Sequence, residues 1–150
     1  FNITKDVEKF VEENNVKTGI VTVQSEHTTC SVFFEEMVHD FDIKGDEYLQ
    51  VDLNKGLEKI YPNQESDGVY YRYPGPAHLK RASTNELFIA DPGIALNGPA
   101  HLKATMLGAS QTFVIEEGEI KKGRCGDIYF VDFDYCRSRS RKVHMCVIGE

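Results

Sequence analysis

Residues 111–148 read QTFVIEEGEIKKGRCGDIYFVDFDYCRSRSRKVHMCVI. Three runs within this stretch are rich in β-branched and aromatic residues, a composition typical of strands: QTFVI, DIYFVDF and KVHMCVI. The tetrapeptide EEGE, which is typical of a turn, follows the first run, and a polar segment over 135–141 precedes the last. We therefore expect three strands in the C-terminal part of the chain.

The rest of the chain adds further strands and fewer helices. IVTVQSE at 20–26, SVFF at 31–34 and LFIA at 87–90 are expected strands. Because strands outnumber helices and the two do not alternate regularly, we expect an α+β fold class. The expected architecture is one compact domain over residues 1–150, in which a mixed or antiparallel β-sheet sandwich is flanked by helices. The chain does not begin with Met, so further residues are expected to precede Phe1.

Two amphipathic helices are expected before residue 62. In DVEKFVEENN, Val7, Phe10 and Val11 have helical spacing, and Thr4 is placed to cap the N-terminus. The second helix is indicated by an apolar stripe that ends before Pro62 and consists of Leu49, Leu53, Leu57 and Ile60. Residues 62–77 have the composition of a loop.

Composition and charge exclude several classes of protein. The chain has 150 residues and a net charge of −7, which disfavours wrapping of nucleic acid. Apolar runs are too short to span a membrane, and the first residues lack the features of a signal peptide. The four cysteines have neither disulfide-framework nor metal-knuckle spacing, so we expect reduced thiols in a cytoplasmic protein.

The hexapeptide GPAHLK occurs twice, at 75–80 and at 98–103. In the second copy Pro99 suits the first helical position and Gly108 the residue after the helix, so a short helix is expected with His101 in its first turn. The positive end of a helix disfavours imidazolium, and a neutral ring is what a metal ion or a general base requires. The alternative is that Gly-Pro-Ala simply begins helices well, and that His101 is a surface or hydrogen-bonded core histidine.

His27 is the second candidate for chemistry. It follows an expected strand and precedes two hydroxyl side chains, Thr28 and Thr29, either of which could orient a ligand. His27 and His101 lack the short spacing of a helical zinc site, so only the fold could bring them together.

The order of four segments resembles the YjbQ-like family, also called the secondary thiamine-phosphate synthase family. The segments are GIVTVQSEHTTCSVFFEE, NGPAHLKATMLGAS, GEIKKGRCGDIYFVDFD and RKVHMCVIGE, and the resemblance covers most of the chain. It implies a compact α+β domain that forms a homotrimer, with a histidine-lined site for a metal or a phosphate.

The resemblance also assigns site residues by position. His27, Thr28, Thr29 and Glu36 match the first motif, His101 matches the second, and Arg141 matches the basic residue before the last strand. The family's Tyr-x-His has its nearest match in Tyr71-Arg72-Tyr73, without a histidine, while His78 follows in the first GPAHLK copy. His78 is therefore the candidate for a third imidazole, although the repeat could also be chance. The chain further lacks the family's Trp-Gln and contains no tryptophan.

Three functions follow as hypotheses. The first is an enzyme for a small phosphorylated molecule with secondary thiamine-phosphate synthase activity. In this enzyme the catalytic residues are His27, Glu36 and His101. Phosphate is bound by Thr28, Thr29 and Arg141. A divalent metal, for which zinc is favoured, is held by His27, His78 and His101. The second is a non-catalytic metal- or metabolite-binding protein. The third is a metal-dependent hydrolase.

Overall fold

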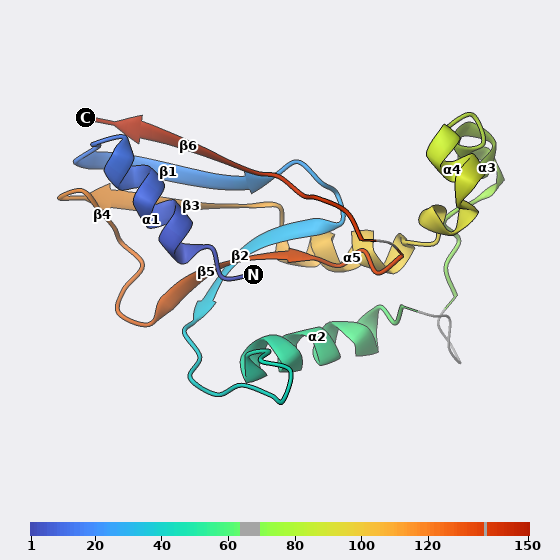
Figure 1. The fold of residues 1–150 in the computed structure, drawn as a ribbon, viewed down its shortest axis with the longest axis horizontal. Coiled ribbons are helices and arrows are strands. Elements are labelled where there is room, and N and C mark those ends of the chain that lie inside the picture. Colours follow the sequence, from blue (N-terminus) through green and yellow to red (C-terminus); the bar gives the residue numbers. More distant parts are fainter. Residues whose placement is uncertain (64–69, 137) are drawn as a thin grey trace.

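Two antiparallel sheets form the body of the protein in the computed structural model, which describes residues 1–63, 70–136 and 138–150. The larger sheet has the strand order β4-β3-β1-β6, and the smaller sheet pairs β2 with β5 (Figure 1). The strands are β1 (Thr18–Ser25), β2 (Cys30–Glu36), β3 (Ser110–Glu116), β4 (Glu119–Ile120), β5 (Gly126–Asp132) and β6 (Val143–Gly149). The expected α+β class and antiparallel pairing are confirmed.

Five α-helices and one 3₁₀ helix complete the described part of the chain. They are α1 (Thr4–Glu13), α2 (Tyr48–Ile60), α3 (Pro76–Ala82), α4 (Glu86–Ala90), η1 (Pro92–Ala95) and α5 (Gly98–Leu107). Each helix of these residues is too short or too polar to cross a bilayer.

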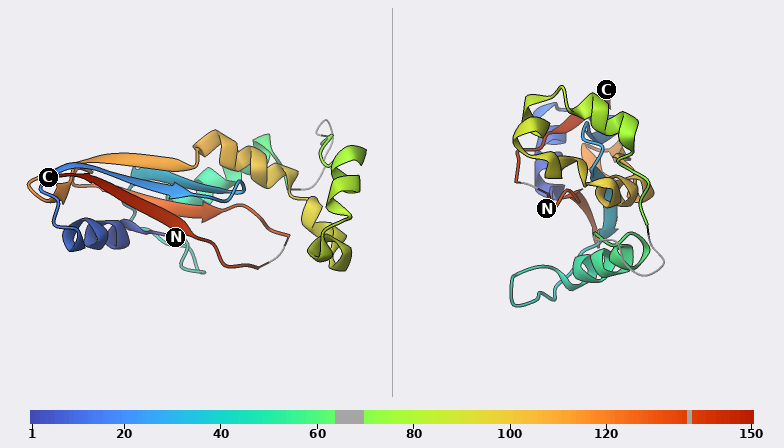
Figure 2. Two further views of the ribbon diagram at one scale, coloured as in Figure 1. Left: turned by 90° about the horizontal axis from the view of Figure 1, so that it is seen from above. Right: turned by 90° about the vertical axis from the view of Figure 1, so that its right-hand side faces the viewer.

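The core lies between the two sheets and is closed by α1 (Figure 2). Alternate residues of β1 and β3 point inward, because side chains of a strand alternate between its two faces. They meet inward residues of β2 and β5 and one apolar stripe of α1. The fully or nearly fully buried members are Val7, Val11, Val21, Val23, Cys30, Val32, Phe113, Ile115, Ile120, Ile128 and Phe130.

Thr4 has a different role from the expected helix cap. Its hydroxyl accepts from the backbone N–H of Ile128 at 2.8 Å and donates to a carboxylate oxygen of Asp127 at 3.1 Å. It is Asn2 whose side-chain oxygen accepts from the backbone N–H of Thr4, at 3.1 Å. The threonine therefore fastens α1 to β5 rather than capping the helix.

The expected strand LFIA is wrong, because these residues lie in α4. Asn85 caps this short helix, since its side-chain oxygen accepts from the backbone N–H of Leu87 at 2.9 Å. The expected loop at 62–77 includes residues 64–69, which lie outside the described residues, and its end overlaps α3. The segment EEGE does form the β3–β4 hairpin, with Glu117 and Gly118 at φ values of 57° and 82°.

The helices α3, α4 and η1 form an arm that extends beyond the end of α5, away from the sheets (Figures 1 and 2). Neither α3 nor α4 contributes a buried residue. The arm is therefore attached to the body mainly where it leads into α5.

Helix α2 is attached to α5 by a buried charge. Lys103 of α5 is 1% exposed, and its Nζ lies 2.5 Å from a carboxylate oxygen of Glu58 and 2.7 Å from the side-chain oxygen of Asn63. Of the expected leucine stripe only Leu57 is buried. Polar contacts to Lys103 therefore contribute to the position of α2 alongside apolar packing.

Candidate functional site

Both copies of GPAHLK begin a helix, and each places its histidine in the first turn. Gly75 precedes α3 with Pro76 at the first helical position, and Pro99 lies in the first turn of α5. Proline suits these positions because its fixed φ is helical and its missing N–H would have no partner there. His78 and His101 therefore occupy equivalent places relative to the proline of their own helix.

Tyr73 lies between these two histidines. Its hydroxyl is 3.0 Å from Nε2 of His78, and its ring centroid lies 4.6 Å from that of His78. The centroid of the His101 ring is 5.9 Å away on an edge-to-face contact. Gly98 permits this approach, because a Cβ there would meet the Tyr73 ring at 3.2 Å. Burial raises the pKa of the Tyr73 hydroxyl, which keeps it a neutral donor.

His101 is also held by the segment that follows β1. Its Nδ1 lies 3.2 Å from the backbone carbonyl oxygen of Thr28. A carbonyl oxygen only accepts hydrogen bonds, so Nδ1 carries the proton in this contact. In the neutral ring Nε2 is then the atom with the lone pair, and it is available to accept a proton.

A pocket of about 470 Å³ opens beside these side chains. It lies between the arm and the start of α5 and is lined by Tyr73, His78, Arg81, Ala82, Thr84, Asn85, Phe88, Ile94, Ala95, Asn97 and His101. Among these lining residues there is an arginine but no carboxylate, although the whole chain has 24 Asp and Glu. The pocket therefore favours an anionic ligand.

His27 is not among the residues that line this pocket. Its Nε2 accepts from the backbone N–H of Lys142 at 3.0 Å and lies 3.9 Å from a carboxylate oxygen of Glu26. His101 contacts the backbone carbonyl of Thr28, the residue that follows His27. His27 is therefore linked to this contact only through the backbone. The structure thus brings the first and second motifs together, but with His27 turned to a different partner.

Thr29 and Arg141 are paired with each other and with Asp132. The guanidinium donates to both carboxylate oxygens of Asp132, at 2.6 and 3.1 Å, and to the Thr29 hydroxyl at 2.9 Å. The Thr29 hydroxyl itself donates to Asp132 at 3.2 Å. Burial raises the pKa of Asp132, but the bonds from Arg141 and from the backbone N–H of Asp134 outweigh it and hold the pKa below its usual value. This cluster fastens the segment before β6 to the ends of β2 and β5.

Glu36 lies apart from the histidines. It is exposed at the last position of β2, whereas Cys30, next to the Thr28–Thr29 pair, is the first. Seven residues of extended chain span about 20 Å, since a strand rises about 3.3 Å per residue. Glu36 therefore does not share a site with His101 in this chain.

The metal set His27, His78 and His101 is not brought together. No group of three His, Cys, Asp or Glu side chains in the described parts of the chain is arranged to hold a metal ion. Nε2 of His27 and Nε2 of His78 already have hydrogen-bond partners in Lys142 and Tyr73. The residues of one chain therefore do not fit a three-imidazole zinc site, and zinc stays a prediction.

Tyr73 and Arg81 are site residues that the sequence did not identify. Tyr73 stands in the Tyr-Arg-Tyr that matches the family's Tyr-x-His, so its position was the available signal. Arg81 gave no such signal, because a lysine and an arginine at the end of a short helix usually interact with the helix dipole.

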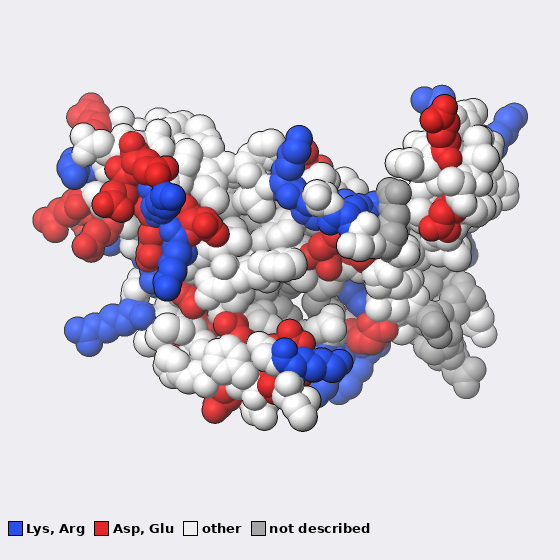
Figure 3. All heavy atoms as spheres, in the orientation of Figure 1, with Lys and Arg blue, Asp and Glu red and all other residues white. Residues whose placement is uncertain are grey.

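On the surface, Lys and Arg gather over the segment leading into β6, and Asp and Glu gather over the end with α1 and β4 (Figure 3).

Comparison with known proteins gives a consistent result. A model of the family described as UPF0047 protein YjbQ-like matches residues 1–150. UPF0047 protein YugU of Bacillus subtilis (strain 168) is 26% identical over 144 residues, covering 96% of this chain and 86% of that protein. A UPF0047 protein of Archaeoglobus fulgidus is 30% identical over 138 residues, covering 92% and 83%.

Solved structures share the fold. An uncharacterized conserved protein of the YjbQ/UPF0047 family from Clostridium acetobutylicum superposes with a TM-score of 0.72 at 28% identity, covering 99% of this chain and 89% of that one. A YbjQ-like protein of unknown function from Sulfolobus solfataricus P2 gives a TM-score of 0.70 at 25% identity, covering 100% and 86%. Both matches include the sheets and the helices described above.

Proposed function

This chain belongs to the UPF0047 family of YjbQ-like proteins, and on that premise we propose that it is a small-molecule enzyme whose site is the pocket between Tyr73, His78 and His101. The main support for this proposal is the position of Tyr73. Tyr73 contacts two imidazoles from separate helices, at ring distances of 4.6 and 5.9 Å, beside a pocket of about 470 Å³. Titratable groups that converge on a concave surface are a common feature of catalytic sites.

The substrate is a small phosphorylated molecule. Arg81 and the two imidazoles are the groups of the pocket that can carry positive charge, and no carboxylate among its lining residues opposes them. A guanidinium matches the geometry of a phosphate, since it can donate two parallel hydrogen bonds. The reaction that we propose is the one that the sequence resemblance implies, thiamine-phosphate synthase activity, in which a pyrimidine pyrophosphate is joined to a thiazole phosphate and pyrophosphate leaves.

Each group then has a role that its contacts support. Nε2 of His101 accepts or returns a proton, because the Thr28 carbonyl holds the other ring nitrogen as a donor. Arg81 offsets the charge that develops on the leaving pyrophosphate. His78 is oriented by the Tyr73 hydroxyl, which fixes the ring toward the pocket.

The test is an assay with both phosphorylated halves of thiamine phosphate. Coupled product together with released pyrophosphate, made by the wild type and lost in His101→Ala, supports the synthase. Cleavage of the pyrophosphate or an ester without coupling identifies a hydrolase instead, and its dependence on added zinc then tests a metal. No turnover in either protein, with unchanged affinity for the substrates, contradicts an enzyme.

A non-catalytic binding protein is the second candidate. It is favoured by Tyr73, which stands where the family's pattern has a histidine, and by the missing tryptophan. We also propose a homotrimer, as the family resemblance implies, a cytoplasmic location, as the spacing of the cysteines indicates, and no nucleic-acid partner, as the net charge of −7 favours. Light scattering on the purified protein measures the first directly.

A further inference from the structure

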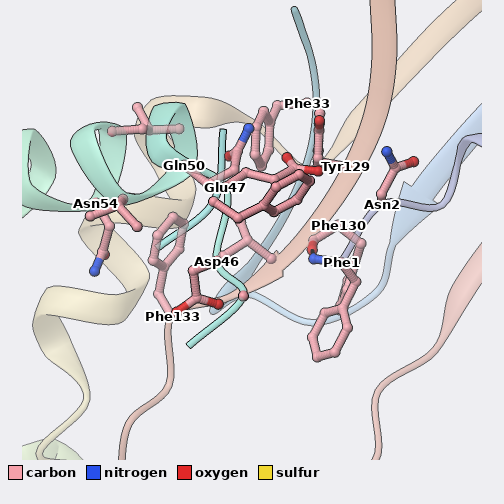
Figure 4. A pocket seen from close by; sticks show the side chains of 15 residues that line it. Phe1, Asn2, Phe33, Asp46, Glu47, Gln50, Asn54, Tyr129, Phe130 and Phe133 are labelled. Carbon is pink, nitrogen blue, oxygen red and sulfur yellow. Dashed lines mark hydrogen bonds between the residues drawn. The ribbon is translucent and has the colours of Figure 1, made fainter. Parts of the chain in front are cut away.

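A second pocket, of about 510 Å³, is lined by residues of α2, β2 and β5 and shares no lining residue with the histidine pocket. Figure 4 shows its lining: Glu47 directly precedes α2 and Gln50 lies in its first turn, while Phe33 and Tyr129 come from β2 and β5. None of its lining residues belongs to the arm or to α5.

Two buried polar atoms in this pocket lack a well-aligned hydrogen bond. Tyr129 is only 3% exposed, and its hydroxyl lies beside the carboxylate of Glu47 without a well-aligned hydrogen bond to any described residue. The buried Oε2 of Glu47 likewise has none there. Unpaired buried polar groups are rare in folded proteins because each one loses its hydration without compensation. A ligand that donates to both atoms would supply that compensation.

The electrostatics of the pocket favour a cation. Its charged side chains are the carboxylates of Asp46 and Glu47, and no Lys, Arg or His is among its lining residues. Burial raises the pKa of Tyr129, and both the contact of its hydroxyl with the carboxylate of Glu47 and the charge of that carboxylate raise it further. Glu35 lies close behind, since its carboxylate accepts from the side-chain amide of Gln50 at 2.7 Å.

Aromatic rings form most of the remaining wall. Phe33 stacks on Tyr129 with centroids 5.4 Å apart and an angle of 16° between the rings. Phe41, Phe130 and Phe133 add further rings. The faces of aromatic rings attract cations, and the rings also cover the apolar part of an organic ligand. The pocket thus combines an aromatic lining, a carboxylate and an unpaired hydroxyl.

We propose that this pocket binds an organic primary amine. The ammonium group donates to Oε2 of Glu47 and to the hydroxyl of Tyr129, and its apolar part lies against Phe33 and the neighbouring rings. The site is separate from the histidine pocket, so it stands or fails independently of the proposed enzyme activity.

Isothermal titration with 2-phenylethylamine tests the proposal, with 2-phenylethanol as the neutral analogue and the trimethylated ammonium as the cation without N–H. The wild type is expected to bind the amine at least about tenfold more tightly than the alcohol, because a charge-assisted hydrogen bond is lost in the latter. The trimethylated compound is expected to bind between the two, because it keeps only the attraction to the rings and the carboxylate.

Two variants and two controls locate the site. Glu47→Gln is expected to weaken amine binding about tenfold, because it removes the negative charge that pairs with the ammonium. Tyr129→Phe is expected to weaken it severalfold, because it removes the hydroxyl acceptor. Asp52→Asn removes the same charge from the exposed surface of α2 and should leave binding unchanged. His101→Ala should also leave it unchanged.

Equal affinity for amine and alcohol, or an unchanged affinity in Glu47→Gln, overturns the proposal, as does the absence of any measurable binding by the folded wild type. Circular dichroism establishes that each variant is folded. If Tyr129→Phe fails to fold, Glu47→Gln with its Asp52→Asn control decides the outcome.

Discussion

Nδ1 of His101 lies 3.2 Å from the backbone carbonyl oxygen of Thr28. This contact joins the first turn of α5 to the segment after β1 and fixes which nitrogen of the ring carries the proton. The contact does not involve the side chains of Thr28 or His27. It therefore assigns the His-Thr-Thr stretch a positioning role through its backbone.

Replacing His101 by asparagine separates position from chemistry. The asparagine amide can still donate to the Thr28 carbonyl, but Nε2 is absent, so we expect turnover to fall by about 10²- to 10⁴-fold while the protein stays folded. Steady-state kinetics and a melting curve measure the two effects. His39→Asn, in an exposed loop, is the matched control. Turnover close to wild type in His101→Asn would remove this ring from the mechanism.

Replacing Tyr73 by histidine tests whether three imidazoles at this pocket converge closely enough to bind zinc. The new imidazole would lie beside His78 and His101 in one pocket, which provides the three nitrogen ligands of a zinc site. We expect zinc affinity to rise by about tenfold or more over the wild type. Calorimetry with zinc measures it, and Tyr73→Phe controls for loss of the hydroxyl. An unchanged affinity would show that the three positions do not converge closely enough.

The buried Lys103 gives a prediction for stability. Glu58→Ala leaves its ammonium without its carboxylate, so we expect the free energy of unfolding to fall by about 3 kcal/mol. In the double variant Glu58→Ala with Lys103→Met the unpaired charge is gone, and much of this loss should be recovered. Urea unfolding measures both. A double variant no more stable than Glu58→Ala would mean that the charge is solvated in the single variant.

The Asp132–Arg141 pair predicts acid sensitivity. The pKa of Asp132 is lower in the folded protein than its ordinary value of about 4. Its stabilisation is therefore fully present above that ordinary value and is lost as the pH falls through the lower, folded pKa. Asp132→Asn should be less stable at neutral pH and show a shallower loss of stability in acid. Asp52→Asn, which changes an exposed carboxylate, should retain the wild-type profile.

The cysteines should differ in their reactivity. Cys125 and Cys146 are exposed, whereas burial and the charge of Asp132 raise the pKa of the buried Cys30 to about 11. At pH 8 a thiol reagent should therefore modify Cys125 and Cys146 quickly and Cys30 only on unfolding. Mass spectrometry of short reactions identifies the modified sites. Early labelling of Cys30 would indicate that the core opens locally.

The sheets could be predicted from the sequence because their signal is local. KVHMCVI and QTFVI have alternating or β-branched apolar residues over a length that is typical of strands. Both segments lie in strands, β6 and β3, at the expected places. LFIA has the same composition, but it follows Thr84-Asn85-Glu86, and the asparagine cap starts a helix. A four-residue apolar run does not distinguish strand from helix, so the flanking cap decides.

The site was only partly predictable, because it depends on contacts between distant segments. The sequence indicated His101 and His78, and both line one pocket. Neither Arg81 nor the pairing of Arg141 with Asp132 can be read from spacing, since each depends on where a helix or strand end falls in space. Glu36 illustrates the converse: its position in the motif is close to Thr29 in sequence, but an extended strand separates them.

The arm that carries His78 has a consequence for heat inactivation. Its helices α3 and α4 bury no residue of their own, whereas the helix that carries His101 includes five buried residues. Segments with so little buried surface open before the rest of a domain does. On warming, catalytic competence should therefore decline at a lower temperature than the calorimetric transition, and it should return on cooling as long as the sheets have stayed intact.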